Sequence, residues 1–188
     1  MHENRILINK LKNFENINSN FLIITLMLFG SILLAISAKV QVPFWPVPMT
    51  MQTFVIFLIG MTYSVRLSFA TVAFYLFPGA IGLPVFAAGG GVAYLVGPTA
   101  GYLYGMLFAS IVISYLANLG FSKTYFKATV SLLIGSAIIF SFGIIYLGYI
   151  IGFEKAVAAG LLPFIPSELF KIVLAVALIP TLHKIITK

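Results

Sequence analysis

The sequence predicts an all-α integral membrane protein with six transmembrane helices in a single membrane domain, residues 1–188. Two observations carry this prediction. Hydrophobic residues make up 61% of the chain and charged residues only 8%, against about 25% in ordinary soluble domains. The mean hydropathy is +1.12, and a water-soluble domain of this length cannot bury so much apolar surface. The length itself suits one domain.

Runs without charge mark the membrane-spanning segments. A spanning helix needs about 20 mostly apolar residues, because each residue adds about 1.5 Å across a hydrocarbon core about 30 Å thick. The uncharged runs are 16–38, 40–65, 67–122, 128–153 and 172–183. The last run is too short to span alone, so its helix must begin near residue 165 and include Glu168 and Lys171. The predicted helices are 21–38, 50–63, 66–77, 98–119, 128–153 and 165–185.

Proline and glycine set most of the inner helix limits. Residues 42–48 contain three prolines, which a helix interior does not tolerate, so the second helix begins near Thr50. Arg66 marks a short turn before the third helix, which Pro78 and Gly79 are expected to end. Residues 78–97 hold six glycines, two prolines and no charge. They predict an apolar, glycine-rich external loop between the third and fourth helices, and such backbone must be buried by protein or hydrated by a cavity.

Basic residues divide unequally between the two sides of this arrangement. One side carries eight and the other carries two, Lys39 and Lys155, while Lys171 lies within the membrane. Because cytoplasmic loops are enriched in lysine and arginine, we expect a multi-pass cell-membrane protein with both termini cytoplasmic and residues 1–20 as a cytoplasmic segment. The eight cytoplasmic residues are Arg5, Lys10, Lys12, Arg66, Lys123, Lys127, Lys184 and Lys188.

The composition also excludes several functions. The chain has four glutamates, no aspartate and no cysteine, and its two histidines, His2 and His183, lie at opposite ends. We therefore expect no metal site, no resident cofactor and no enzymatic reaction. The phosphate-loop pattern Gly-x-x-x-x-Gly-Lys-Ser/Thr is missing, so the chain does not bind ATP in that way. The net charge is +7, and the basic residues lie between the apolar runs. This pattern indicates membrane orientation rather than nucleic-acid binding.

Glu168 and Lys171 are the most informative polar residues. They are three positions apart and share one helix face. An ionised side chain at the centre of a membrane helix costs about 2.5–3.5 kcal/mol, which makes a functional role the default. They form either a polar clamp for a ligand or a structural pair, with Lys171 extending toward the interface as a further alternative.

Two stripes of small residues predict close helix packing. Gly97, Gly101, Gly105 and Ala109 recur every four residues, which favours contact with a neighbouring helix of the same chain. The second stripe, on the first helix, serves either a partner protein or an internal contact. It consists of Ser31, Ala35 and Ala38.

Aromatic residues gather at the predicted external ends. Trp45, Tyr75 and Tyr94 form either an interfacial belt or the wall of a pocket for a flat apolar ligand. Gln52, in the first turn of the second helix, caps that helix or hydrogen-bonds a ligand. The backbone of residues 89–91 permits close approach to a ligand, with Phe86 and Tyr94 as cover. We predict that the loop orders over the ligand as a lid; a static plug is the alternative.

Four motifs follow one another along the chain: Pro48-Met49-Thr50-Met51-Gln52-Thr53, Tyr75-Leu76, Gly82-Leu83-Pro84-Val85-Phe86-Ala87 and Gly97-Pro98-Thr99-Ala100-Gly101-Tyr102. Together they resemble the BioY family, the biotin-binding S components of energy-coupling factor (ECF) vitamin transporters. The resemblance covers roughly residues 21–185. Two positions differ from the family pattern, which has a glycine where Ala100 stands and usually an aspartate where Glu168 stands.

The resemblance implies an ECF S-component fold of six helices in membrane lipid. It implies high-affinity biotin binding at the external side and uptake with a coupling module of one transmembrane subunit and two ATPase subunits, the only users of ATP. Three alternatives stay open: an S component for another small vitamin, an autonomous small-solute carrier and an intramembrane enzyme. The implied substrate-binding residues are Trp45, Gln52, Tyr75, Phe86, Gly90, Gly91, Tyr94, Glu168 and Lys171, and the implied docking residues are Ser31, Ala35 and Ala38.

Overall fold

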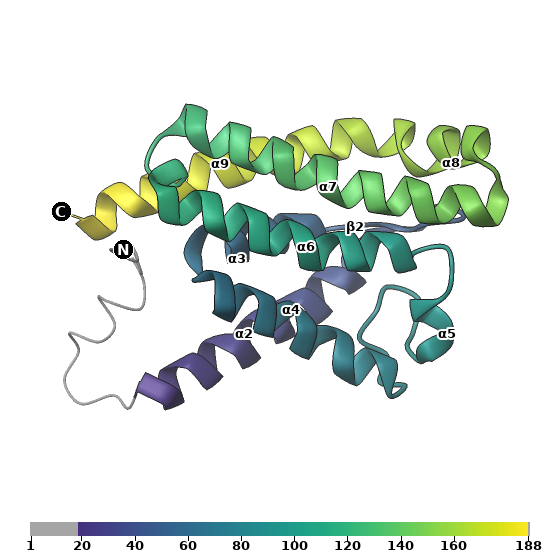
Figure 1. Ribbon diagram of the computed structural model, residues 1–188, viewed down its shortest axis with the longest axis horizontal. Helices are drawn as coiled ribbons and strands as arrows, with labels where there is room; N and C mark the ends of the chain where they lie inside the picture. The colour runs from purple at the N-terminus through teal and green to yellow at the C-terminus, as the bar shows by residue number, and fades with distance from the viewer. Residues whose placement is uncertain (1–18, 188) are drawn as a thin grey trace.

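The structure, a computed structural model, describes residues 19–187, with side chains for residues 20–179 (Figure 1). Residues 1–18 of the predicted cytoplasmic segment 1–20 and the side chains of His183 and Lys184 therefore lie outside the described part, as does Lys188. The longer helices are α2 (Ser19–Lys39), α3 (Gln52–Thr62), α4 (Val65–Ala80), α6 (Ala100–Leu116), α7 (Tyr125–Ile151) and α9 (Ile165–Thr187). Shorter elements are α5 (Val92–Leu95), α8 (Phe153–Gly160), the π-helical turn η1 (Ala117–Phe121), the 3-10 turn η2 (Leu162–Phe164), and strands β1 (Gln41–Val42) and β2 (Met49–Thr50).

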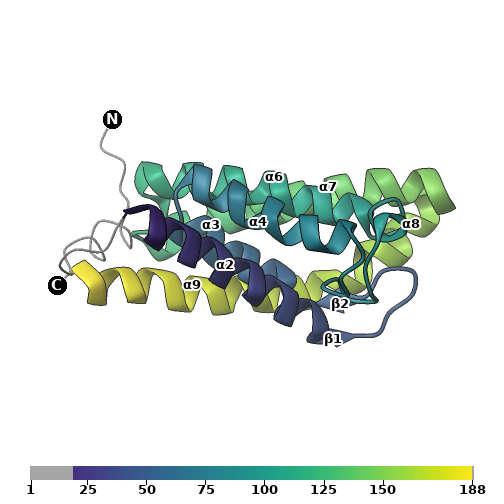
Figure 2. The same cartoon turned by 90° about the horizontal axis from the view of Figure 1, so that it is seen from below.

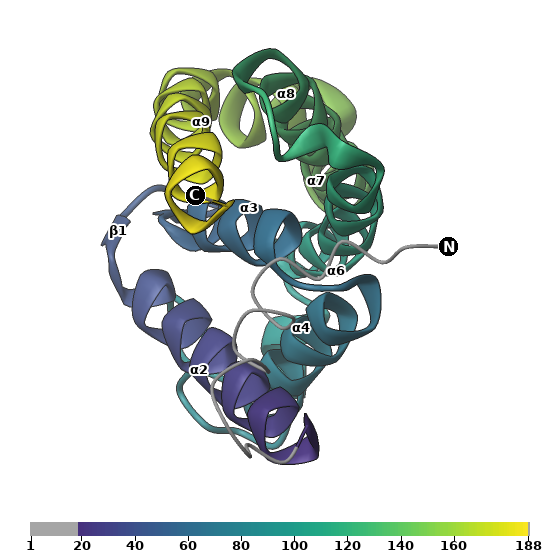
Figure 3. The same ribbon diagram turned by 90° about the vertical axis from the view of Figure 1, so that its left-hand side faces the viewer.

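The helices form one bundle with α3 in its middle (Figure 3). Helices α2 and α4 lie on one side of α3, while α7, α8 and α9 lie on the other, and α6 packs against α3, α4 and α7. The core runs through all of these contacts. Its most deeply buried large side chains are Leu34, Ile56, Phe57, Val72, Tyr75, Phe86, Ile113, Leu132, Ile139 and Leu147.

Four helical segments are long and apolar enough to cross a membrane. They are Asn20–Lys39, Ala100–Phe121, Tyr125–Ile151 and Phe153–Ile179, the last of which joins α8, η2 and most of α9. Helices α3 and α4 are shorter, with 11 and 16 residues. The structure is therefore a mostly helical, multi-span bundle as predicted. Among the described residues, two short helices that were not predicted, α5 and α8, form within segments that were expected to be loops.

The predicted end of the third helix at residue 77 is wrong, because α4 continues through Pro78 to Ala80. Proline removes one N–H donor and crowds the carbonyl four residues before it, and in the last turn of a helix no further turns are disturbed. The last turn stays closed because the Phe77 carbonyl accepts from Ile81 N at 3.2 Å and the Pro78 carbonyl accepts from Leu83 N at 3.0 Å. Gly79 is buried there, and a Cβ at this position would overlap the Phe86 ring.

Small residues let α6 and α7 approach closely, as the first stripe predicted. A Cβ on Gly105 would lie 2.8 Å from Ile139 Cα and 2.9 Å from the Ile139 carbonyl oxygen. Gly101 likewise faces the α7 backbone at Phe142 and Gly143. Only glycine permits such contacts. Gly97 lies before α6 and faces the carbonyl of Ala93 instead.

The two ends of the bundle differ in charge and in structure. The start of α2, the α3–α4 turn and the end of α9 lie at one end, and the β-hairpin and α8 lie at the other (Figure 2). Ser114 Oγ donates to the Tyr63 carbonyl at 2.5 Å, which joins α6 to the α3–α4 turn. Among the described residues, the first end carries the exposed Arg66, Lys123 and Lys127. We call the opposite end, with Lys39 and Lys155, the hairpin end.

The glycine-rich segment is folded onto the hairpin end. Gly82, Gly89 and Gly91 have φ angles of 104°, 133° and 100°, which L side chains rarely adopt. Gly91 N donates to the Gly79 carbonyl at 2.7 Å, and Phe86 pairs with Gly89 in a short β-bridge. The segment also contains the single helical turn α5. The ordering of this loop over a ligand, as a lid, stays a prediction.

Candidate functional site

A pocket lies between α3, α6, α7, α9 and the glycine-rich segment, toward the hairpin end. The space between its walls is about 480 Å³ when the solvent-open mouth is included. One wall is aromatic and apolar, whereas the other carries a charged pair, an amide and hydroxyl groups. The lining residues are Val47, Pro48, Thr50, Gln52, Thr53, Ala87, Tyr94, Thr99, Tyr102, Leu103, Met106, Ile139, Phe140, Phe164, Glu168 and Lys171.

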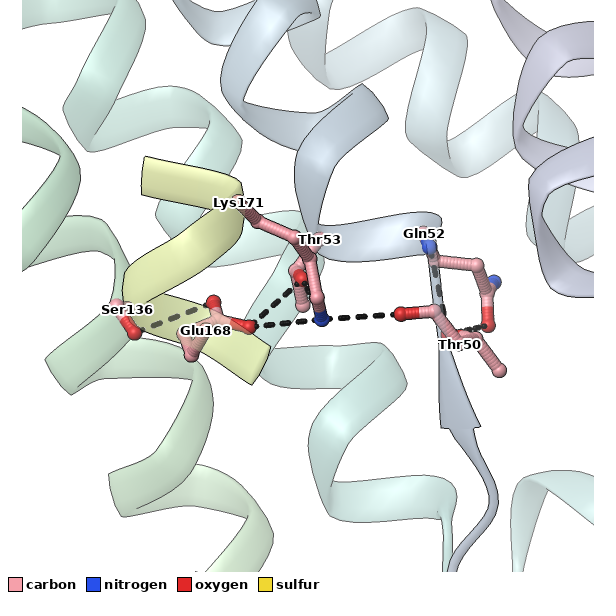
Figure 4. A network of polar contacts seen from close by, with 6 residues as sticks. All are labelled: Thr50, Gln52, Thr53, Ser136, Glu168 and Lys171. Carbon is pink, nitrogen blue, oxygen red and sulfur yellow. Dashed lines mark hydrogen bonds and ion pairs between the residues drawn. The ribbon is translucent and has the colours of Figure 1, made fainter. Parts of the chain in front are cut away.

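Glu168 and Lys171 form a buried ion pair on the pocket wall (Figure 4). Lys171 Nζ lies 3.0 Å from Glu168 Oε2, and only 4% of Glu168 and 3% of Lys171 is exposed. Glu168 sits in the first turn of α9, where the positive end of the helix dipole favours a carboxylate. Lys171 follows one turn later on the same face. The helix therefore presents both charges to the pocket at a fixed spacing.

Neutral groups from three other elements complete the hydrogen bonding of this pair (Figure 4). Lys171 Nζ also donates to Thr53 Oγ1 at 2.8 Å and to the Thr50 carbonyl at 3.0 Å. Thr53 Oγ1 donates to Glu168 Oε2 at 2.9 Å, and Ser136 Oγ donates to Glu168 Oε1 at 3.2 Å. All three ammonium protons thus have acceptors, and both carboxylate oxygens have donors. This arrangement compensates the cost of burying the charges.

A second chain of hydrogen bonds connects the pocket to the glycine-rich segment. Gln52 Oε1 accepts from Thr50 Oγ1 at 3.2 Å, and Gln52 Nε2 donates to Tyr75 Oη at 2.8 Å. Tyr75 Oη in turn donates to the Val85 carbonyl at 3.3 Å. Gln52 therefore does not cap α3, whose N-cap, Met51, makes no side-chain capping bond. Its amide is instead held at the pocket wall.

Aromatic rings form much of the remaining wall. Tyr102 and Phe164 stack with ring centroids 6.4 Å apart, and Phe140 meets both rings edge to face. The Tyr102 hydroxyl is occupied elsewhere, because it donates to the Gly160 carbonyl at 2.9 Å. The ring faces are therefore the part that Tyr102 offers to the pocket. Flat or aliphatic groups suit such a surface.

The structure brings four of the nine predicted substrate-binding residues to the pocket. Gln52, Tyr94, Glu168 and Lys171 line it directly. Two more support the wall from behind. Phe86 stacks on Tyr94 with ring centroids 4.9 Å apart and meets the Tyr75 ring edge to face at 5.5 Å. Tyr75 and Phe86 thus position pocket residues while being almost completely buried themselves.

The other three predicted residues lie outside the pocket. Trp45 is 82% exposed and lines a separate hollow with Lys155. Gly90 lines an adjoining groove, and Gly91 precedes α5 with its N–H bonded to Gly79. The groove shares Pro48, Tyr94 and Thr99 with the pocket, so it forms an approach from the hairpin end. The groove residues are Pro46, Pro48, Ala88, Gly90, Ala93, Tyr94, Gly97, Pro98 and Thr99.

Sequence reasoning missed Thr53 and Ser136 as partners of the ion pair. Thr53 ends the first of the four family-like motifs, so its position offered a signal. Ser136 offered none, because it is one of several serines in an apolar helix and meets Glu168 only through the packing of α7 on α9. Among the described residues, no three metal-ligating side chains gather in one place.

The small-residue stripe on α2 faces the chain's own helices. Ser31 and Ala38 are buried, with α2 packed on α3 and α4, and Ala35 is half-buried. The internal contact, which was one of the two interpretations of this stripe, is therefore present. Docking of a partner on α2 stays a prediction, and Ala35 is the member of the stripe that keeps exposed surface.

Comparison with known proteins gives consistent results. Residues 10–188 match the model of the BioY family. A protein of Rickettsia prowazekii (strain Madrid E), named probable biotin transporter BioY, is 35% identical over 168 residues, which cover 89% of this chain and 86% of that protein. The biotin transporter BioY of Thermotoga maritima is 37% identical over 155 residues, covering 81% of this chain and 90% of the relative.

A solved structure is also similar. It is the crystal structure of the S component for biotin from an ECF-type ABC transporter, with a TM-score of 0.79 and 26% sequence identity. The match covers 90% of this chain and 94% of that one. The family model and the extent of these alignments show that this chain belongs to the BioY family.

Proposed function

We propose that this protein is the biotin-specific S component of an ECF-type transporter, which binds biotin at the external side of the membrane for uptake. The choice of biotin is supported by the relatives named biotin transporters and by the similar crystal structure of an S component for biotin. The observation that carries the proposal is the buried Glu168–Lys171 pair at the polar wall of an otherwise apolar and aromatic pocket.

The chemistry of biotin matches this division of the pocket. The ureido ring of biotin has two N–H donors and one carbonyl acceptor. Glu168 accepts from the N–H groups, and Lys171 donates to the carbonyl after releasing one of its present acceptors. The thiophane ring and aliphatic chain suit the faces of Tyr102, Phe140 and Phe164. The ligand thus replaces hydrogen bonds that the pair already makes, so no unpaired charge is left buried.

Uptake requires a source of energy outside this chain. We propose that one transmembrane coupling subunit and two ATPase subunits supply it, and that ATP is used only there. The missing phosphate-loop pattern supports this division of labour. In this proposal the chain is a binding and transport subunit, with no resident cofactor and no enzymatic reaction of its own.

We further propose six membrane crossings with both termini cytoplasmic. The basic Arg66, Lys123 and Lys127 at one end of the bundle support this orientation, as do the start of α2 and the end of α9, which lie at the same end (Figure 2). The hairpin end then faces outward. Single cysteines at positions 45 and 123 should differ in intact cells: only Trp45→Cys should react with a membrane-impermeant thiol reagent. Reaction of Lys123→Cys from outside would reverse the orientation.

Removal of the charges tests the binding site. We predict that Lys171→Ala weakens biotin binding by about 2–5 kcal/mol, the range for truncating one member of a buried, hydrogen-bonded charge pair. Glu168→Gln should weaken binding less, because the amide retains one acceptor oxygen. The measurement is the biotin dissociation constant of each purified variant by calorimetric titration, together with the melting temperature of the ligand-free protein.

Lys155→Ala is the matched control, since it removes an exposed lysine at the hairpin end outside the pocket. It should bind biotin as the wild-type protein does. Unchanged affinity in Lys171→Ala, with only a lower melting temperature, would assign the pair a structural role. A wild-type protein that binds another vitamin and not biotin would favour the alternative S-component specificity.

Docking of the coupling module on α2 is testable at Ala35. We predict that Ala35→Leu lowers biotin uptake in cells that contain the module while it leaves the dissociation constant unchanged, because the larger side chain blocks close approach of another helix. Ala177→Leu, at an exposed alanine of α9, is the control and should transport normally. Loss of binding in step with uptake would place Ala35 in internal packing alone.

A further inference from the structure

Three consecutive carbonyl groups of the glycine-rich segment accept hydrogen bonds from side chains outside it. Val85 O accepts from Tyr75 Oη at 3.3 Å, Phe86 O from Lys39 Nζ at 2.5 Å, and Ala87 O from Gln41 Nε2 at 3.1 Å. Tyr75 belongs to α4, whereas Lys39 and Gln41 lie at the junction of α2 and β1. The segment is thus held from two sides at one point of its backbone.

These contacts add to the segment's own backbone bonds, in which the Phe86 carbonyl also accepts from Gly89 N at 3.3 Å. Its internal bonds in this stretch are short-range, such as Phe86 N to the Gly89 carbonyl at 2.9 Å. Glycines at 89–91 lower the cost of alternative conformations. The buried Phe86 ring and side-chain donors with fixed positions together hold the stretch 85–87 in place. A charged donor such as the Lys39 ammonium makes a stronger bond than a neutral one.

The held stretch belongs to the pocket. Ala87 lines it, and Phe86 stacks on Tyr94, another lining residue. The donors are tied to the pocket as well. Gln41 pairs with Thr50 in the β-hairpin, and the Thr50 carbonyl accepts from Lys171. The hairpin therefore spans from the buried ion pair to the carbonyls of the glycine-rich segment.

We propose that Lys39 and Gln41 are positioning residues that fasten residues 85–94 over the pocket and so set the rate at which the ligand leaves. This inference rests on the proposed function for the identity of the ligand. Both residues stand behind the pocket lining, so their effect passes through Phe86, Ala87 and Tyr94. Removing them frees the covering segment without altering the ion pair, which separates retention of the ligand from its recognition.

The test uses the purified full-length protein loaded with labelled biotin and chased with unlabelled biotin. We expect Gln41→Leu, which loses a neutral hydrogen bond, to raise the dissociation rate about threefold. Lys39→Met, which loses a charge-assisted hydrogen bond, should raise it about tenfold. The melting temperature of the ligand-free protein should change little. Lys39→Arg retains N–H donors and should restore slow release. Lys155→Met, the matched exposed lysine, should release biotin at the wild-type rate.

Hydrogen exchange of residues 85–91 provides a readout that needs no ligand. It should be faster in Lys39→Met and Gln41→Leu than in the wild-type protein, and unchanged in Lys155→Met. Dissociation rates within twofold of wild type in both variants, or an equal rise in Lys155→Met, would overturn the proposal. If wild-type protein binds no biotin, the proposed function fails, and unchanged exchange at residues 85–91 would then refute the fastening separately. If Lys39→Met does not fold, Gln41→Leu decides by the same criteria.

Discussion

Two opposite charges buried within a membrane bundle set the strictest requirement on this structure. In a low-dielectric interior, any unmatched proton or lone pair of Glu168 and Lys171 costs free energy. Helix α9 cannot supply the partners alone, so α3, α7 and the β-hairpin must converge on it with Thr53, Ser136 and the Thr50 carbonyl. The close packing of helices in this bundle serves that convergence, and the pocket lies where the partners meet.

The glycine-rich segment solves a related problem by different means. Its side chains are apolar, yet its backbone carries polar groups at the end of the bundle and must find partners there. Helix ends and side chains supply them: Gly79 offers a carbonyl, and Tyr75 and Lys39 offer donors. Glycine at positive φ permits the turns that bring these groups together. The same segment contributes Ala87 and Tyr94 to the pocket lining, so its polar contacts help to shape the pocket.

Composition and charge patterning were enough to predict the membrane class, the approximate helix ranges and the pair on α9, because these depend on properties local in sequence. The role of Ser136 and the carbonyls held by Lys39 and Gln41 were not predictable in this way, since they depend on side chains distant in sequence. Trp45 shows the converse: its place at a predicted external end allowed either an interfacial belt or a pocket wall, and the structure leaves it exposed outside the pocket. Pro78 shows that a helix can accept proline in its last turn.

The Glu168–Lys171 pair, in this view, exists for the ligand and not for stability. Replacing a buried pair by apolar side chains of similar volume is often neutral or stabilising, so the double variant Glu168→Leu, Lys171→Met separates the two roles. The decisive measurement is its melting temperature without ligand, taken together with its biotin dissociation constant. We expect a melting temperature at or above that of the wild-type protein and no detectable biotin binding. An unfolded variant, or one that still binds biotin tightly, would contradict this role for the pair.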